Sequence, residues 1–184
     1  MFLKSSIGRW FGILLCLLAL APWEAMAQSK EYQIKAVFLF NFAQFVDWPT
    51  NAFPEAQAPL VIGILGEDPF GSYLDETVRG EKVNNRPLLV QRYRSVDQIK
   101  SCHILFISRS EADRLEEIFN GLKGRNILTV GDYDGFAQRG GMVRFVTEKN
   151  KVRLRIGLEA AKAAHLTISS KLLRPAEIVA PGKD

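Results

Sequence analysis

A glycine-containing loop is the first segment whose residues could do chemistry. Residues 66–72, Gly-Glu-Asp-Pro-Phe-Gly-Ser, follow an apolar run and have the glycine spacing of a phosphate-binding loop. The loop has no lysine, and Glu67 and Asp68 stand where the phosphate would lie. Two negative charges at that place repel a phosphate. We therefore expect no nucleotide site here.

A second acidic segment, residues 131–135, reads Gly-Asp-Tyr-Asp-Gly and resembles the start of a calcium loop. Such a loop needs an oxygen at its third ligand position and a bidentate glutamate at its last. Phe136 and Val143 occupy those positions, so a turn is the better interpretation. The two histidines, His103 and His165, belong to no HxxE, HxxxH or cysteine-rich motif. The sequence thus predicts no metal site of standard spacing.

Nucleophilic catalysis has little support in the sequence. Folding can bring a serine beside His103 or His165, but the chain has no Gly-x-Ser-x-Gly elbow to expose a nucleophile. We expect no catalytic residue, no cofactor and no enzyme. An unrecognised hydrolase with a Ser–His pair stays open as an alternative.

The first 27 residues have the parts of a secretory signal peptide. Lys4 and Arg9 give a positive start, residues 10–21 an apolar stretch, and residues 25–27 an Ala-Met-Ala cleavage site before Gln28. The apolar stretch is shorter than the roughly 20 residues of a membrane span. The sequence therefore predicts cleavage after residue 27 and export of the rest.

Export would leave a mildly basic chain with one cysteine. The 24 basic and 20 acidic residues lose Lys4, Arg9 and Glu24, which leaves 22 and 19, a net charge of +3. Such a balance does not indicate nucleic acid as a partner. Cys16 leaves with the signal peptide, so Cys102 has no intrachain partner and is expected to be buried as a small hydrophobe.

The most apolar segment after the signal peptide is residues 35–49. Its large aromatic residues are Phe38, Phe40, Phe42, Phe45 and Trp48. Part of the spacing also fits a strand, but the length of the run, the narrow polar stripe of Asn41, Gln44 and Asp47, and the final Pro49 favour a helix. A helix so apolar is expected to be central, with other elements packed around it.

The elements that follow alternate between strands and helices. We expect strands at 60–65, 87–93, 103–107 and 126–130, a helix from Asp68 to Val78, a helical turn at 95–100, and a helix from Ser108 or Ser110 to Leu122. This alternation predicts an α/β fold whose central sheet is mostly parallel or mixed, with helices on both faces.

The last third of the chain has a different pattern. Residues 142–147 and 152–156 predict a β-hairpin, followed by a short helix at 158–164, an extended segment at 166–169 and a helical turn at 170–176. We expect one α/β domain over residues 28–180 and a loose tail over 181–184.

Two surface features of this last third could serve a partner. Lys149, Lys151, Arg153 and Arg155 form a basic hairpin face that could meet acidic protein or lipid headgroups, although solvation and edge protection also account for it. The apolar residues after the hairpin exceed the need of one short helix. We predict a partner-binding patch there, made by Leu158, Leu166 and Ile168.

Several stretches together resemble the YfiR family of periplasmic proteins. They are IKAVFLFNFAQFVDWP (34–49), IGILGEDPFG (62–71), CHILFIS (102–108), ILTVGD (127–132), GGMVRF (140–145) and LTISSKLL (166–173). The resemblance covers nearly all of residues 34–179.

The resemblance implies regulation without catalysis. The relatives repress an inner-membrane diguanylate cyclase by binding its periplasmic sensor domain, and an outer-membrane lipoprotein sequesters them; release raises cyclic di-GMP and favours biofilm. They carry disulfides, whereas this chain keeps only Cys102, so redox control is not carried over. A homodimer is compatible with this function. The alternative is a periplasmic small-molecule binding module with an apolar pocket lined by Phe42 or Trp48.

Overall fold

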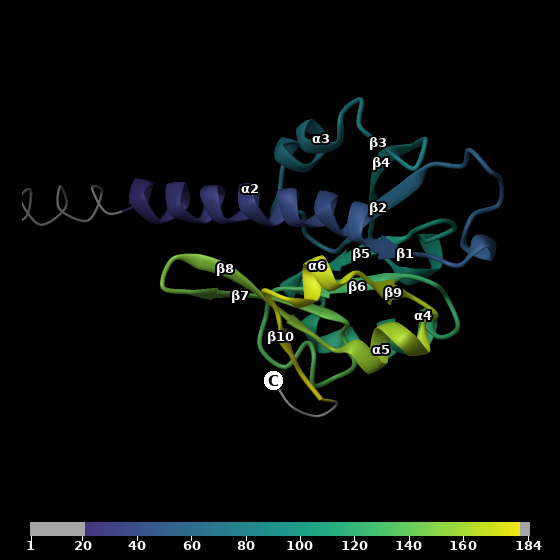
Figure 1. Ribbon diagram of the computed structural model, residues 1–184. Coiled ribbons are helices and arrows are strands. Elements are labelled where there is room, and N and C mark those ends of the chain that lie inside the picture. Colours follow the sequence, from purple (N-terminus) through teal and green to yellow (C-terminus); the bar gives the residue numbers. More distant parts are fainter. Residues whose placement is uncertain (1–20, 181–184) are drawn as a thin grey trace, which may run out of the picture.

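The computed structural model describes residues 21–180 of the chain, with side chains from Lys30 onward. A mixed eight-stranded sheet lies at its centre (Figure 1), and its helices are α2 (Ala21–Phe45), α3 (Ser72–Val78), α4 (Leu115–Leu122), α5 (Leu158–Ala163) and α6 (Ser170–Leu173). The predicted loose tail and most of the predicted signal peptide lie outside the described residues. Residues 21–27 form the first turns of α2.

The sheet confirms the predicted fold class. Its spatial order is β10 (Glu177–Ile178), β8 (Lys151–Ile156), β7 (Val143–Glu148), β6 (Leu128–Gly131), β5 (Ile104–Ile107), β2 (Leu60–Leu65), β4 (Arg86–Tyr93) and β3 (Lys82–Val83). Strands β4, β2, β5, β6 and β7 are parallel, whereas the β7–β8 and β3–β4 pairs are antiparallel. The chain leaves β2 in one direction to form β4 and then returns past β2 to form β5. Sheets with this order usually bind ligands at the carboxyl ends of the two strands where the direction reverses, here β2 and β5.

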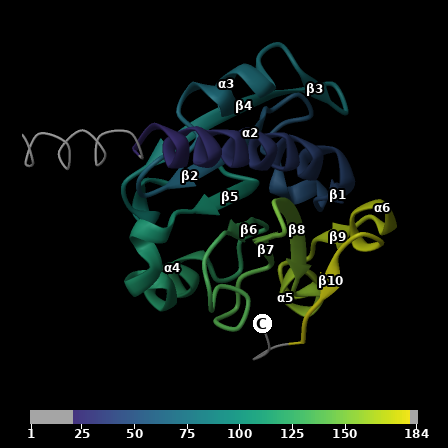
Figure 2. The ribbon, with the colours of Figure 1, turned by 90° about the vertical axis from the view of Figure 1, so that its left-hand side faces the viewer.

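Two apolar clusters, one on each face of the sheet, form the core. Strand β5 contributes to both: Ile104 and Phe106 pack in the cluster that contains α2, and Leu105 and Ile107 pack in the cluster that contains α4. A strand buried on both faces needs such an uninterrupted apolar sequence. Strand β5 accordingly lies between α2 and α4 (Figure 2).

The predicted aromatic helix ends four residues earlier than expected. Helix α2 stops at Phe45, and β1 (Val46–Asp47) pairs with β9 (Thr167–Ile168) in a small antiparallel ladder. The backbone N–H of Ser169 also donates to the Phe45 carbonyl at 2.9 Å. Pairing with this distant segment replaces the last helical turn, a tertiary contact that local pattern does not reveal.

Other elements also differ from the sequence-based expectation. Helix α3 begins at Ser72 instead of Asp68, because the Asp68 carboxylate accepts from the Phe70 N–H at 2.7 Å and forms a tight turn. A 3₁₀ segment, η3 (Arg109–Arg114), precedes α4 where we expected α-helix. The short edge strands β3 and β10 were not predicted.

Both hairpins turn through two residues with positive φ. These are Asn84 and Asn85 between β3 and β4, and Lys149 and Asn150 between β7 and β8, with φ between 49° and 64°. Such turns match the twist of the flanking strands. They fix the register of β7 against β8, in which Val143 faces Ile156.

Candidate functional site

Helix α2 carries apolar side chains on its outer face as well as on its inner face, which is unusual for a helix at the surface. Its inner face packs on the sheet: Leu39 and Phe42 are fully buried, and Phe42 stacks on Phe145 of β7 with ring centroids 5.8 Å apart. Helix α3 packs beside α2, where Tyr32 meets the Phe70 ring edge-on at 5.4 Å. The β7–β8 hairpin runs along the other side of α2 (Figure 1).

The outer face of α2 carries two exposed apolar residues between polar ones. The exposed residues of this face are Lys30, Ile34, Val37 and Gln44, and the half-buried Asn41 lies between the last two. These five residues are spaced three or four apart, and we call them the outer α2 stripe. Ile34 is 40% exposed and Val37 is 49% exposed, so two branched apolar side chains lie at its centre. Exposed apolar side chains next to each other commonly mark a contact surface.

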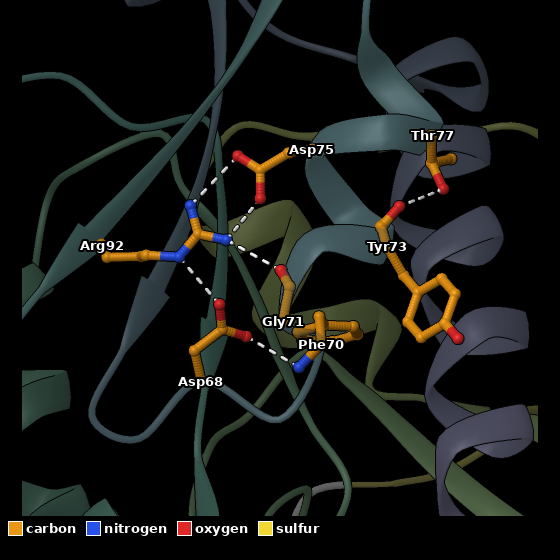
Figure 3. A network of polar contacts seen from close by, with 7 residues as sticks. All are labelled: Asp68, Phe70, Gly71, Tyr73, Asp75, Thr77 and Arg92. Atoms are coloured by element: carbon orange, nitrogen blue, oxygen red, sulfur yellow. Dashed lines mark hydrogen bonds and ion pairs between the residues drawn. The ribbon is translucent and has the colours of Figure 1, made fainter.

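Tyr73 in the first turn of α3 is a third exposed apolar residue on this side of the molecule. It is 39% exposed, and its ring points toward α2 (Figure 3). Its backbone carbonyl accepts from the Thr77 hydroxyl at 2.6 Å inside α3. Together with Ile34 and Val37, Tyr73 gives the candidate site an aromatic flank, a residue type enriched in protein–protein contacts.

A buried polar cluster fixes the N-terminal half of α2 to the sheet. The Lys35 ammonium lies 2.6 Å from Asp132 Oδ2 and 2.6 Å from Glu31 Oε1, and the Tyr32 hydroxyl donates to Asp132 Oδ2 at 2.8 Å. The side chains of Lys35 and Asp132 are each only 4% exposed. Burial, and next the charge of Asp132, raise the pKa of Tyr32. This cluster holds α2 in one register, so the outer stripe is presented on a rigid element.

The same cluster explains the acidic segment that resembles a calcium loop. Asp132 directly follows β6, and its carboxylate is engaged by Lys35 and Tyr32. Among the described residues there is no group of three or more His, Cys, Asp or Glu side chains placed to hold a metal ion. Asp132 thus serves to dock α2 onto the carboxyl end of the sheet.

The usual ligand position of this sheet topology is filled by the protein's own side chains. Gly66 follows β2 with φ at +90°, and a Cβ added there would lie 2.4 Å from Ser110 Oγ and 2.8 Å from Glu111 Cγ. The Glu67 N–H donates to Ser110 Oγ at 3.0 Å. The loops that follow β2 and β5 therefore touch each other, with Ser110 and Glu111 packed directly against Gly66.

Arg92 pairs with Asp68 of the glycine loop and with Asp75 of α3 (Figure 3). Its guanidinium contacts Asp68 Oδ2 at 2.7 Å, Asp75 Oδ2 at 2.5 Å and the Gly71 carbonyl at 3.1 Å. The hydrogen bond from Arg92 holds the pKa of Asp75 below its ordinary value. These contacts tie the loop and α3 to β4, and so fix the position of Tyr73.

His103 has a structural role. Its Nδ1 accepts from the Val61 N–H at 3.0 Å, its Nε2 lies 3.2 Å from the Ala52 carbonyl, and its ring stacks on Phe53 at 4.3 Å. With both nitrogens used by the backbone, His103 is not available to activate a serine. His165 is exposed, with φ at 58° in the turn after α5.

The predicted pocket beside Phe42 or Trp48 does not match their surroundings. Phe42 is fully buried in the core, and the Trp48 indole N–H donates to the His103 carbonyl at 3.2 Å. Both residues serve to hold α2 and the segment after it in place.

The three residues predicted to bind a partner lie in different environments. Leu166 is 3% exposed and Ile168 is 7% exposed; both belong to the core cluster beneath α2, whereas Leu158 at the start of α5 is half-buried. Leu158 is therefore the member of the predicted patch that a partner can reach directly. The outer stripe and Tyr73 were not predicted, although the even spread of apolar residues around 35–49 was the signal that could have found the stripe.

The predicted basic hairpin face is partly neutralised within the molecule. Arg155 lies 2.9 Å from Glu177 Oε2 and 3.8 Å from Glu148 Oε1, and Arg153 lies 3.6 Å from Glu148 Oε2. Lys149 and Lys151 at the tip are exposed. Solvation and edge protection account for this face.

Comparisons with known proteins point to one family. A sequence model described as YfiR/HmsC-like matches residues 32–177. The comparison with curated proteins gives no match. Among solved structures, the chain is similar to the ABC domain in complex with L-Trp from Streptococcus pneumonia, with a TM-score of 0.48 and 10% identity. That alignment covers 65% of this chain and 55% of the other, so the chain spans about half the length of that structure.

Proposed function

The chain belongs to the YfiR/HmsC-like family, and on that premise we propose that it is a periplasmic regulator of an inner-membrane diguanylate cyclase. It acts by protein–protein contact with the periplasmic sensor domain of the cyclase, and an outer-membrane lipoprotein is a second partner. The exported form begins at residue 28, after cleavage of residues 1–27, and residues 28–180 make up one domain. No helix within residues 21–180 is long and apolar enough to cross a membrane.

The observation that carries this proposal is the exposed apolar centre of the outer α2 stripe. A rigid helix that exposes Ile34 and Val37 to water, beside Tyr73, is a surface suited to burial by another protein. Leu158 on α5 remains the accessible part of the predicted C-terminal patch and is a second candidate contact.

Regulation follows if the partner is bound more tightly in one of its two states. Repression requires preference for the inactive state, and a full switch of the population needs about 10⁴-fold, or about 5.5 kcal/mol. Burial of the exposed parts of Ile34, Val37 and Tyr73 contributes about 1 kcal/mol each. That sum falls short, so we expect polar residues at the rim, such as Lys30 and Gln44, to contribute as well.

The test compares cellular cyclic di-GMP in a strain that lacks the protein with strains that receive exported variants. We expect deletion to raise the cyclic di-GMP level. The native protein should return the level to that of the parent strain, and Val37→Asp should not. The matched control is Leu89→Asp on β4, where an apolar side chain of 44% exposure lies away from α2. We expect this control to restore repression.

The outcomes separate the function from the surface. Cyclic di-GMP that does not respond to deletion contradicts the regulatory function. A normal response to deletion with full activity of Val37→Asp contradicts only the assignment of the outer α2 stripe. In that case Leu158→Asp is the next variant, because Leu166→Asp would place a charge in the core and unfold the protein.

A further inference from the structure

An open pocket lies at the amino edge of the sheet, opposite the edge where Asp132 holds α2. Its volume is about 340 Å³, within the range of small-molecule sites. Three segments form it: the loop after β1, the residues before β5 and the residues before β6. Nothing in the regulatory function described above uses this pocket.

The wall formed by the loop after β1 is held in place by contacts with His103. The Ala52 carbonyl lies 3.2 Å from His103 Nε2, and Phe53 stacks on the imidazole. The guanidinium of Arg86 lies over the Phe53 ring, 3.8 Å from its centre. The pocket therefore exists before any ligand arrives, and binding needs little ordering of the loop.

The charges around the pocket have one sign. Lys100 and Arg125 line it, and its lining contains no carboxylate. Within residues 21–180 no ion pair involves either side chain. Arg125 is half-buried and donates through Nη2 to the Ile99 carbonyl at 2.7 Å, which orients its guanidinium. Two cations without an ion-pair partner among residues 21–180, at one concave place, favour an anion.

The rest of the lining is neutral or apolar. Cys102 lies at the floor, 7% exposed, with Sγ 3.1 Å from the Ile104 carbonyl. Burial raises the pKa of the Cys102 thiol to about 12, so at neutral pH the thiol carries no charge that would repel an anion. Ala52, Pro54 and Ile127 supply apolar surface, and Asn51 and Asn126 supply amides.

We propose that this pocket binds a small organic anion, with a carboxylate or a phosphate held by Lys100 and Arg125 and a short apolar part against Ala52, Pro54 and Ile127. A free metabolite can carry such a carboxylate or phosphate next to an apolar part, and so can a group on a larger molecule. The loop that forms one wall continues directly from α2 through β1, so the site and the outer α2 stripe lie on one continuous segment.

The experiment titrates the exported protein with benzoate, phenyl phosphate and inorganic phosphate, at constant ionic strength set with chloride. Binding is followed by calorimetry and by the backbone amide signals of residues 100–102 and 125–127. We expect saturable binding of at least one organic probe and weaker binding of inorganic phosphate. Lys100→Gln and Arg125→Gln should each weaken it about tenfold, the contribution of one charge-assisted hydrogen bond.

The matched controls are Lys149→Gln and Lys151→Gln at the hairpin tip, which remove the same charge from exposed positions. They should bind as the native protein does. Equal weakening by the controls would mean attraction by net charge alone and would overturn the site, as would the lack of saturable binding by all three probes. If Arg125→Gln fails to fold, the exposed Lys100 decides the question, because none of the hydrogen bonds or ion pairs described for residues 21–180 uses its side chain.

Discussion

The two faces of α2 are made of similar residues but have opposite surroundings. Leu39 and Phe42 on the inner face have no exposed surface, whereas Ile34 and Val37 on the outer face keep 40% and 49% of theirs. The sheet and Phe145 cover the first pair. Nothing within residues 21–180 covers the second. The comparison teaches that the inner face stabilises the fold, while the outer face is available to stabilise a complex.

The largest effect is expected from shortening the inner face. Phe42→Ala removes a fully buried ring that stacks on Phe145, and such changes cost about 3–5 kcal/mol in the free energy of unfolding. Urea unfolding followed by circular dichroism measures this loss. A cost below about 1 kcal/mol would show that the inner face of α2 is not part of the core and would remove the basis of the comparison.

The next effect concerns the polar cluster that holds the two faces in register. Lys35→Met leaves the Asp132 carboxylate buried without its cation, and removal of one partner from a buried pair costs about 3–5 kcal/mol. We expect the lower end, because the Tyr32 hydroxyl still donates to Asp132.

The double variant Lys35→Met, Asp132→Asn provides the control for this pair. It removes both charges, so it should unfold less readily than Lys35→Met alone. Unfolding in urea again gives the free energies. Equal loss in the single and double variants would mean that the cost lies in packing and not in an uncompensated charge.

The sequence predicted the covered inner face, but it also led us to expect other elements packed around the helix, whereas the outer face is exposed, and the difference has a physical reason. Local spacing is enough to indicate that residues 35–45 are helical and apolar, and that 60–65 and 103–107 are buried strands. Which side of an evenly apolar helix is covered depends on partners distant in the chain, such as Phe145 and the β9 segment.

Contacts between residues distant in the chain also explain why the sequence did not reveal the role of Asp132 or the burial of Leu166 and Ile168. The spacing around Asp132 resembles a calcium loop, and only the fold shows that Lys35, 97 residues earlier, takes up its carboxylate. Likewise, the excess of apolar residues near the C-terminus predicted a contact patch. The fold places Leu166 and Ile168 of that patch beneath α2, where they complete the core.

A smaller effect is expected from pH at the segment that follows α2. Burial lowers the pKa of His103 to about 4 from its ordinary value of 6.5; the charge of Arg86 also lowers it, and the contact with the Ala52 carbonyl acts in the opposite direction. The unfolded chain takes up a proton between pH 6.5 and 4 that the folded chain excludes. The contribution of His103 to the free energy of unfolding is therefore complete above pH 6.5. It is lost as the pH falls toward 4, by roughly 3 kcal/mol at most.

Thermal unfolding between pH 5 and 6.5 measures this dependence, and His103→Asn is its control. The asparagine can accept from Val61 but does not titrate, so its stability should vary less with pH in this window. A native protein whose stability is as flat as that of the variant would place the His103 pKa near its ordinary value and would contradict its burial in a neutral form.

The smallest effect on folding, and the one that completes the comparison, is expected on the outer face. Val37→Asp changes a side chain that is half exposed and makes no contact that the core needs, so its free energy of unfolding should lie within about 0.5 kcal/mol of the native value. The same variant should lose the partner, since a charge at the centre of an apolar contact must be desolvated when the partner binds. Phe42→Ala on the inner face should behave in the opposite way: it lowers the amount of folded protein, and any loss of partner binding results from that. If Val37→Asp instead destabilised the chain by several kcal/mol, the outer face would be covered in solution by a second copy or by another part of the chain, and size-exclusion chromatography of the native protein would show which of the two holds.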